Sequence, residues 1–189
     1  MFCFAVHCRV CAGRCKTKTM RYDAGMGAPI RILGLDPGLN ATGWGVIAVD
    51  GVRLSWVGHG VIKAPAKAEM STRLSFIYDA VEGLISDHHP DEAAIEDQFV
   101  HANPGSALKL GQARAAAMLA PARAGLPVGE YAPRLIKKAV VGTGAAEKGQ
   151  VAAMVSVLLP GTKAKDDAAD ALAIAICHAH HRKTVKAAS

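Results

Sequence analysis

The first regular pattern along the chain consists of three apolar segments with the length and composition of β-strands. They cover residues 30–35, 42–49 and 53–62. Asp36-Pro37-Gly38 closes the first segment, and Asp50-Gly51 between the second and third is a strong hairpin signal. These segments therefore predict three successive antiparallel strands.

Beyond residue 70 the apolar positions follow the spacing of helices, separated by short strands. Over residues 71–88 apolar side chains recur at i, i+3, i+4 and i+7 until Pro90 ends the pattern. Further helices are predicted over 106–124, 133–140, 146–159 and 167–181, and short strands over 92–96 and 128–131. Three antiparallel strands followed by strand–helix alternation predict an α/β fold, with a mixed five-stranded sheet flanked by helices.

The two ends of the chain lie outside this pattern. Residues 30–182 are expected to form one domain, followed by a polar tail over 183–189. Residues 1–29 are interpreted as a disordered or spurious extension, because they lack the long apolar segment of a signal peptide and have only weak transit-peptide character. Cysteines crowd this extension without the paired spacing of a zinc finger or ribbon, at Cys3, Cys8, Cys11 and Cys15. Their role stays open.

Composition limits the class of protein. Hydrophobic residues make up 51% of the 189, enough for a sizeable core, and no apolar run of about 18 residues predicts a membrane span. Beyond the extension the only cysteine is Cys177, which favours a reducing, cytoplasmic location. Residues 101–165 hold nine Lys/Arg against two acids, a surplus that favours a surface facing nucleic acid. Solvated helix faces would have the same composition, so charge alone does not decide.

Four carboxylates are the candidates for chemistry. Asp36 ends the first predicted strand and Glu96 the fourth, where ligands of such sheets bind. Asp167 and Asp170 share one face at the start of the last helix. Taken singly, Asp36 could be a turn residue and the two helix acids could serve the helix end, whereas Glu96 has no such ordinary explanation. Taken together, their charges would need a hard cation such as Mg²⁺, and two such ions about 4 Å apart promote phosphodiester hydrolysis.

Several segments, in this order, resemble the motifs of the RuvC family of Holliday-junction resolvases. They are Ile32-Leu33-Gly34-Leu35-Asp36-Pro37-Gly38 with 42–47, Ala94-Ile95-Glu96, 106–114, 140–148 and 167–173. The resemblance implies an RNase H-like fold and a Mg²⁺-dependent crossover junction endodeoxyribonuclease with about two ions per site, for which Mn²⁺ can substitute. It further implies a homodimer that resolves four-way DNA (Holliday) junctions by paired symmetric nicks in recombination and repair. Metal-activated water would attack the phosphodiester, and the RuvA–RuvB branch-migration complex would be a partner.

The same resemblance assigns roles to individual residues. The catalytic, metal-binding acids are matched by Asp36, Glu96, Asp167 and Asp170. The pattern D-A-A-D selects Asp167 over Asp166. DNA-binding roles are implied for Phe99, Lys109, Arg114, Lys137 and Lys148. Phe99 matches an aromatic inserted near the junction point, and the alternative is a core residue that anchors its loop. Without the motif, Lys137 and Lys148 would be interpreted as solvated surface residues.

The sequence departs from the family pattern just after Glu96. The motif Glu96-Asp97-Gln98-Phe99 differs from that of many relatives, which have an apolar residue before the Phe, and Asp97 adds a negative charge beside the site. The histidines near predicted helix ends are interpreted as solvated or capping, and none is assigned to a metal. They are His88, His89, His178, His180 and His181.

Two other classes of protein share parts of the pattern. Actin-like ATPases and sugar kinases also open with an apolar strand, Asp-x-Gly and a later Gly, as at Asp36, Gly38 and Gly43. They need a second lobe with another phosphate loop, and this sequence has none. A nonenzymatic junction binder of the same fold would be favoured by a missing acid, but all four are present.

Overall fold

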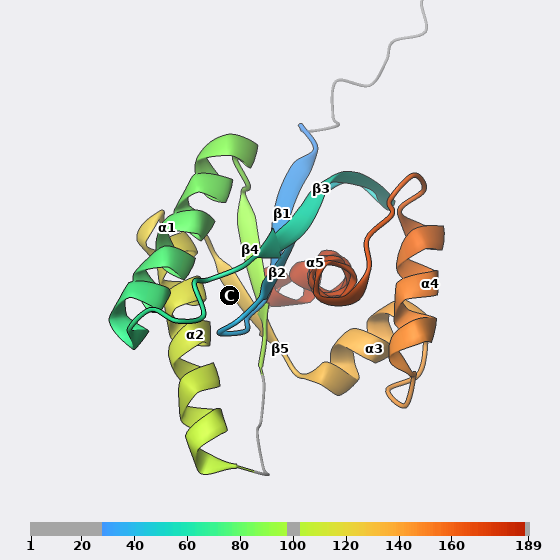
Figure 1. The fold of residues 1–189 in the computed structure, drawn as a ribbon. Coiled ribbons are helices and arrows are strands. Elements are labelled where there is room, and N and C mark those ends of the chain that lie inside the picture. Colours follow the sequence, from blue (N-terminus) through green and yellow to red (C-terminus); the bar gives the residue numbers. More distant parts are fainter. Residues whose placement is uncertain (1–27, 98–102, 188–189) are drawn as a thin grey trace, which may run out of the picture.

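A mixed five-stranded sheet forms the centre of the computed structural model, which describes residues 28–97 and 103–187. Its order is β3-β2-β1-β4-β5, with β1 (Ile30–Asp36), β2 (Thr42–Asp50), β3 (Arg53–Ile62), β4 (Glu92–Glu96) and β5 (Val128–Tyr131). The first three strands form an antiparallel meander, whereas β4 and β5 are added in parallel beside β1 (Figure 1). The predicted α/β class and its five strands are confirmed.

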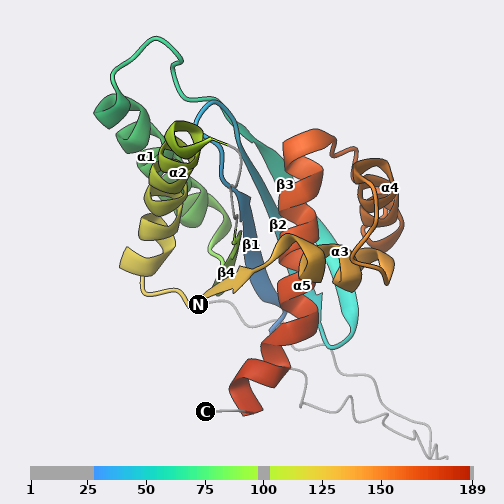
Figure 2. The same ribbon diagram turned by 90° about the horizontal axis from the view of Figure 1, so that it is seen from below.

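Helices cover both faces of this sheet (Figures 1 and 2). One face carries α1 (Met70–His88) and α2 (Pro104–Arg123), and the other carries α3 (Pro133–Val141), α4 (Lys148–Leu158) and α5 (Asp166–Ala187). Because side chains of a strand alternate between faces, β1 sends Leu33 and Leu35 into the core beneath α1 and α2, and Ile32 into the core beneath α5. Within the described ranges, no helix is long and apolar enough to cross a membrane.

Helix α5 packs closely against β1 and β2, and this closeness positions the start of the helix. Gly34 on β1 faces α5, where an added Cβ would overlap the carbonyl oxygen of Ala171. Gly43, near the start of β2, stands in the same relation to the carbonyl of Asp167. Glycines on the strands and alanines on the helix therefore let the first turns of α5 reach the carboxyl end of β1.

The two last helices begin at residues that differ slightly from the predicted ones. α4 begins at Lys148 because Glu147 caps it. The Glu147 side chain accepts from the backbone of Gln150, and the Gln150 side chain accepts from the Glu147 N–H at 2.9 Å. α5 begins at Asp166, whose φ of 47° is a left-handed conformation that aspartate tolerates better than most residues, and it continues to Ala187, past the predicted end.

A buried polar network holds the distal half of α5 to the sheet. Glu92, the first residue of β4, accepts hydrogen bonds from Arg182 Nε at 3.0 Å and Nη2 at 2.7 Å, and from His178 Nε2 at 2.8 Å. The other ring nitrogen of His178 lies 2.8 Å from the hydroxyl of Tyr131 and accepts from it, because the proton is needed at Nε2 to meet a carboxylate. The interpretation of His178 as solvated or capping is wrong: α5 is covered by the sheet at this point, and the side chain is 7% exposed.

Candidate active site

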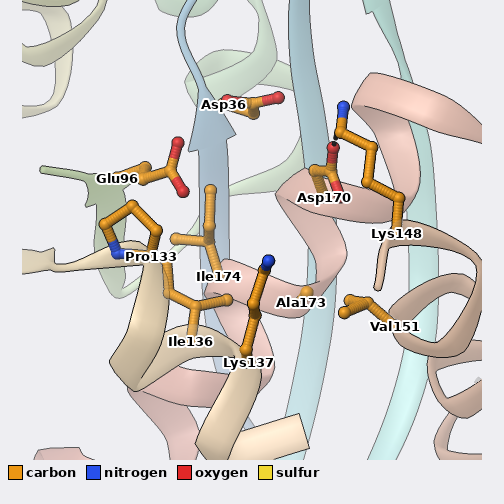
Figure 3. Close-up of a pocket in the computed structure, with 10 residues that line it drawn as sticks. All are labelled: Asp36, Glu96, Pro133, Ile136, Lys137, Lys148, Val151, Asp170, Ala173 and Ile174. Atoms are coloured by element: carbon orange, nitrogen blue, oxygen red, sulfur yellow. Dashed lines mark hydrogen bonds and ion pairs between the residues drawn. The ribbon is translucent and has the colours of Figure 1, made fainter. Parts of the chain in front are cut away.

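Two of the predicted acids end neighbouring parallel strands. β1 and β4 pair with Leu35 opposite Ile95, so the next residues, Asp36 and Glu96, reach the same edge of the sheet. Asp170 comes to this edge from the first turns of α5. The three carboxylates line one pocket of about 200 Å³ (Figure 3). The fold thus brings together acids from three distant segments of the chain.

Asp167 lies beside this pocket and does not line it. Its backbone packs on Gly43, and its negative charge helps to raise the pKa of Asp36. Asp166, the other acid that could have been matched to the motif, is exposed and is not among the main charges that raise the pKa of Asp36. The geometry therefore favours Asp167 over Asp166, as the D-A-A-D pattern does.

Asp36 is the acid whose ionisation the site disturbs most clearly. Burial, followed by the charges of Glu96, Asp170 and Asp167, raises the pKa of its carboxyl to about 7, against a lowering effect of Lys148. Acids that repel one another in a pocket destabilise the folded state unless a cation compensates them. Such a cluster is typical of functional sites.

Two lysines flank the acids (Figure 3). Lys148, the first residue of α4, places Nζ 3.4 Å from Oδ2 of Asp170, and its side chain is 82% exposed. The neighbouring Asp170 is the main cause of the raised pKa of Lys148. Lys137 extends from α3 toward the same pocket. Because Glu147 fixes where α4 begins, it also fixes where Lys148 leaves the backbone.

Arg73, which the sequence did not single out, anchors the turn that follows Asp36. It lies on the buried stripe of α1, four residues before Ile77. Its Nη2 donates to the carbonyl oxygen of Leu39 at 3.0 Å and to Oδ1 of Asn40 at 2.7 Å. A charged residue on an otherwise apolar helical stripe is the signal that could have identified it.

Comparison with known proteins covers almost the whole described domain. The family model for "Crossover junction endodeoxyribonuclease RuvC" matches residues 32–178. The chain belongs to the RuvC family. Relatives include RuvC of Maricaulis maris, which is 65% identical over 164 residues (87% of this chain and 99% of the relative). RuvC of Azorhizobium caulinodans is 57% identical over 154 residues (81% and 91%).

RuvC structures from Thermus thermophilus have the same fold. Thermus thermophilus RuvC in complex with Holliday junction substrate is 33% identical, with a TM-score of 0.77 over 82% of this chain and 96% of that chain. A second Thermus thermophilus RuvC structure is 32% identical, with a TM-score of 0.74 over 82% and 97%. The prediction of a RuvC-family protein with an RNase H-like fold is therefore confirmed.

Two other predicted DNA-binding residues of this RuvC-family chain, Lys109 and Arg114, do not line the acidic pocket. Lys109 is exposed on α2, and Arg114 on the same helix is bound to protein groups. Phe99 lies outside the described residues. DNA contact by Phe99, Lys109, Arg114, Lys137 and Lys148 stays a prediction.

The RuvC-family acids can be compared with what a metal ion requires. In the described part of the chain, no three His, Cys, Asp or Glu side chains are grouped closely enough to hold a metal. Asp36, Glu96 and Asp170 nevertheless offer hard oxygen donors to one pocket. Mg²⁺ commonly binds through one or two carboxylates, while waters and substrate phosphate complete its shell. The donors therefore fit Mg²⁺ by their chemistry, and the metal assignment stays a prediction.

Proposed function

We propose that this protein is a crossover junction endodeoxyribonuclease that resolves Holliday junctions by paired symmetric nicks in recombination and repair. The observation that carries this proposal is a single pocket lined by Asp36, Glu96 and Asp170 and flanked by Lys137 and Lys148. Carboxylates are ligands for hard cations, and lysines attract DNA phosphates. Membership of the RuvC family and the Thermus thermophilus RuvC complex with Holliday junction substrate support a four-way junction as the DNA.

The proposed reaction assigns a part to each group in the pocket. The acids that would hold Mg²⁺, about two ions per site with Mn²⁺ as a substitute, are Asp36, Glu96, Asp167 and Asp170. When bound, such ions supply Lewis acidity at the phosphate and a water of lowered pKa. Lys148, beside Asp170, and Lys137, on α3, would offset the negative charge of the phosphate as it enters. Water attack on the phosphodiester would leave a 5′-phosphate and a 3′-hydroxyl.

The partners follow from the symmetry of the reaction and from the family. Two opposed strands must be cut, so we propose that a homodimer supplies two sites to one junction. The RuvA–RuvB branch-migration complex as a partner, and the cytoplasm as the location, are proposed from family membership alone.

A nicking assay tests this function directly. Synthetic four-way, three-way and linear DNA of the same sequences would be incubated with the protein, with and without Mg²⁺. Paired nicks at symmetric positions, confined to the four-way substrate and dependent on Mg²⁺, are expected. Equal nicking of linear DNA, or nicks in one strand alone, would contradict junction resolution.

A further inference from the structure

Arg114 on α2 is bound to the segment that carries Glu96. Its Nε donates to the backbone carbonyl oxygen of Glu96 at 2.9 Å. Its Nη2 pairs with the carboxylate of Glu130 on β5 and lies 3.7 Å from Oδ1 of Asp97. The side chain of Arg114 is only 20% exposed. One guanidinium therefore joins α2, the end of β4 and β5.

The last residues of β4 present their side chains to opposite faces of the sheet. The N–H of Asp97 donates to the carbonyl oxygen of Tyr131 at 2.8 Å, so the ladder with β5 continues one residue past Glu96. Strand alternation then places Glu96 on the face of the pocket and Asp97 on the face of α2. Glu130 lies opposite Ile95 and shares the α2 face with Asp97. Arg114 thus reaches Glu96 from the side away from the pocket.

We propose that Arg114 is a positioning residue for Glu96, a role that rests on the proposed nuclease function. By binding the Glu96 carbonyl, it fixes the backbone from which the carboxylate projects into the pocket. By pairing with Asp97 and Glu130, it holds two further negative charges on the α2 face. The planar fork of a guanidinium donates in several directions at once, which the ammonium of a lysine cannot reproduce. Arg114 thereby makes Asp97 compatible with a pocket already crowded by acids.

A direct contact between Arg114 and DNA would have a different signature from positioning. Loss of one phosphate contact weakens junction binding and lowers the slope of log Kd against log salt by about one. Loss of a group that orients a metal ligand instead lowers metal affinity or activity by roughly 10- to 100-fold, and leaves DNA affinity in place. Three measurements on the full chain separate these cases.

The variants are Arg114→Lys, which keeps the charge but loses the fork, and Arg114→Gln, which loses both. Arg123→Gln, an exposed arginine on the same helix, is the matched control. The measurements are the single-turnover nicking rate at saturating protein, the junction Kd across salt concentrations, and calorimetric binding of Mn²⁺ to the free protein. Both Arg114 variants should lose roughly 10- to 100-fold in nicking rate and bind Mn²⁺ more weakly, with Kd and salt slope unchanged.

A second, independent readout comes from removing the Asp97 carboxylate, whose charge Arg114→Gln no longer neutralises. Asp97→Asn in the Arg114→Gln background should restore part of the lost rate, because the carboxylate that Arg114 neutralises is gone. Unchanged rates and Mn²⁺ affinities would overturn the proposal, and so would a weaker Kd with a smaller salt slope. If Arg114→Gln does not fold by thermal melting, Arg114→Lys decides the outcome. If the wild-type protein does not nick junctions, the proposed function fails, while Mn²⁺ binding still tests the positioning of Glu96.

Discussion

Strand β4 carries a glutamate at each end, and the two have opposite surroundings. Glu92 is 9% exposed, and hydrogen bonds from Arg182 and then His178 lower its pKa to about 2 despite burial. Glu96, four residues later and on the same face of the strand, opens into the pocket that Asp36 and Asp170 also line. Glu92 is paired with cationic groups inside the protein, and its end of β4 is called the matched end. Glu96 belongs to a cluster of acids that repel one another, and its end of β4, with the pocket, is called the repulsive end.

Helix α5 packs against both ends of β4, and it supplies different side chains to each. Near its start α5 brings Asp170 to the edge of the sheet beside Glu96. Toward its other end it brings His178 and Arg182 to Glu92. The contacts of Glu92 with His178 and Arg182 hold α5 against the sheet. Helix α5 in turn keeps Asp170 beside the other acids of the pocket, despite their mutual repulsion. We infer that repulsion in the pocket lowers the stability of the fold and that the network at Glu92 offsets part of that loss.

The largest expected effect is at the repulsive end. Asp36→Asn keeps the shape of the side chain but removes a carboxylate ligand, and should lower junction nicking by at least about a thousandfold, or several kcal/mol of barrier. Junction affinity should be retained, and without divalent cations at neutral pH the free energy of unfolding should rise, because repulsion is relieved. Nicking, electrophoretic mobility shift and urea unfolding measure the three quantities. Loss of binding together with nicking would argue against a catalytic role.

At the matched end the expected loss is in stability. Glu92→Gln leaves Arg182 without its charge partner, and should lower the free energy of unfolding by about 3 kcal/mol. Junction nicking should persist at temperatures where the variant is folded. Asp79→Asn, an exposed acid on α1, is the control for removal of one charge. A stability equal to that of the wild-type protein would mean that the network does not hold the helix.

The contribution of Glu92 to the free energy of unfolding should also depend on pH, in a direction that its pKa fixes. The pKa of Glu92 is about 2 in the folded protein and 4.5 ordinarily. Its contribution is therefore complete above pH 4.5 and is lost as pH falls from 4.5 toward 2. Urea unfolding at several pH values across this window should show a steeper loss for the wild-type protein than for Glu92→Gln. If the free energies of unfolding of the two proteins changed in parallel with pH, Glu92 would not be the cause of the loss.

A smaller effect is expected at the lysine beside the acids. Lys148→Ala should lower nicking by about tenfold and reduce the slope of log Kd against log salt by about one, because a single phosphate contact is lost. Lys163→Ala, an exposed lysine, is the matched control. An unchanged slope would place Lys148 outside the DNA path and leave it as a partner of Asp170 alone.

The sequence predicted the repulsive end better than the matched one, for a physical reason. Asp36 and Glu96 each follow a short apolar run, and neighbouring parallel strands place such residues at one edge of the sheet. The partners of Glu92 lie about ninety residues later in the chain, and their contact depends on how α5 packs. Local patterns do not specify that packing, so the sequence predicts a solvated or capping role for His178. For the same reason the sequence does not single out Arg73, and it assigns Arg114 to DNA without predicting the protein groups that Arg114 binds.

The smallest expected effect concerns Asp166, next to a predicted metal ligand. It is exposed, has a φ of 47° and is not among the main charges that raise the pKa of Asp36. Asparagine adopts this left-handed conformation at least as readily, so Asp166→Asn should change the free energy of unfolding by less than about 0.5 kcal/mol. Nicking by Asp166→Asn should stay within about twofold of the wild-type rate, whereas Asp167→Asn should lose most of it. The reverse result would shift the register of the site by one residue, and would mean that the repulsion around Asp36 does not identify the ligands.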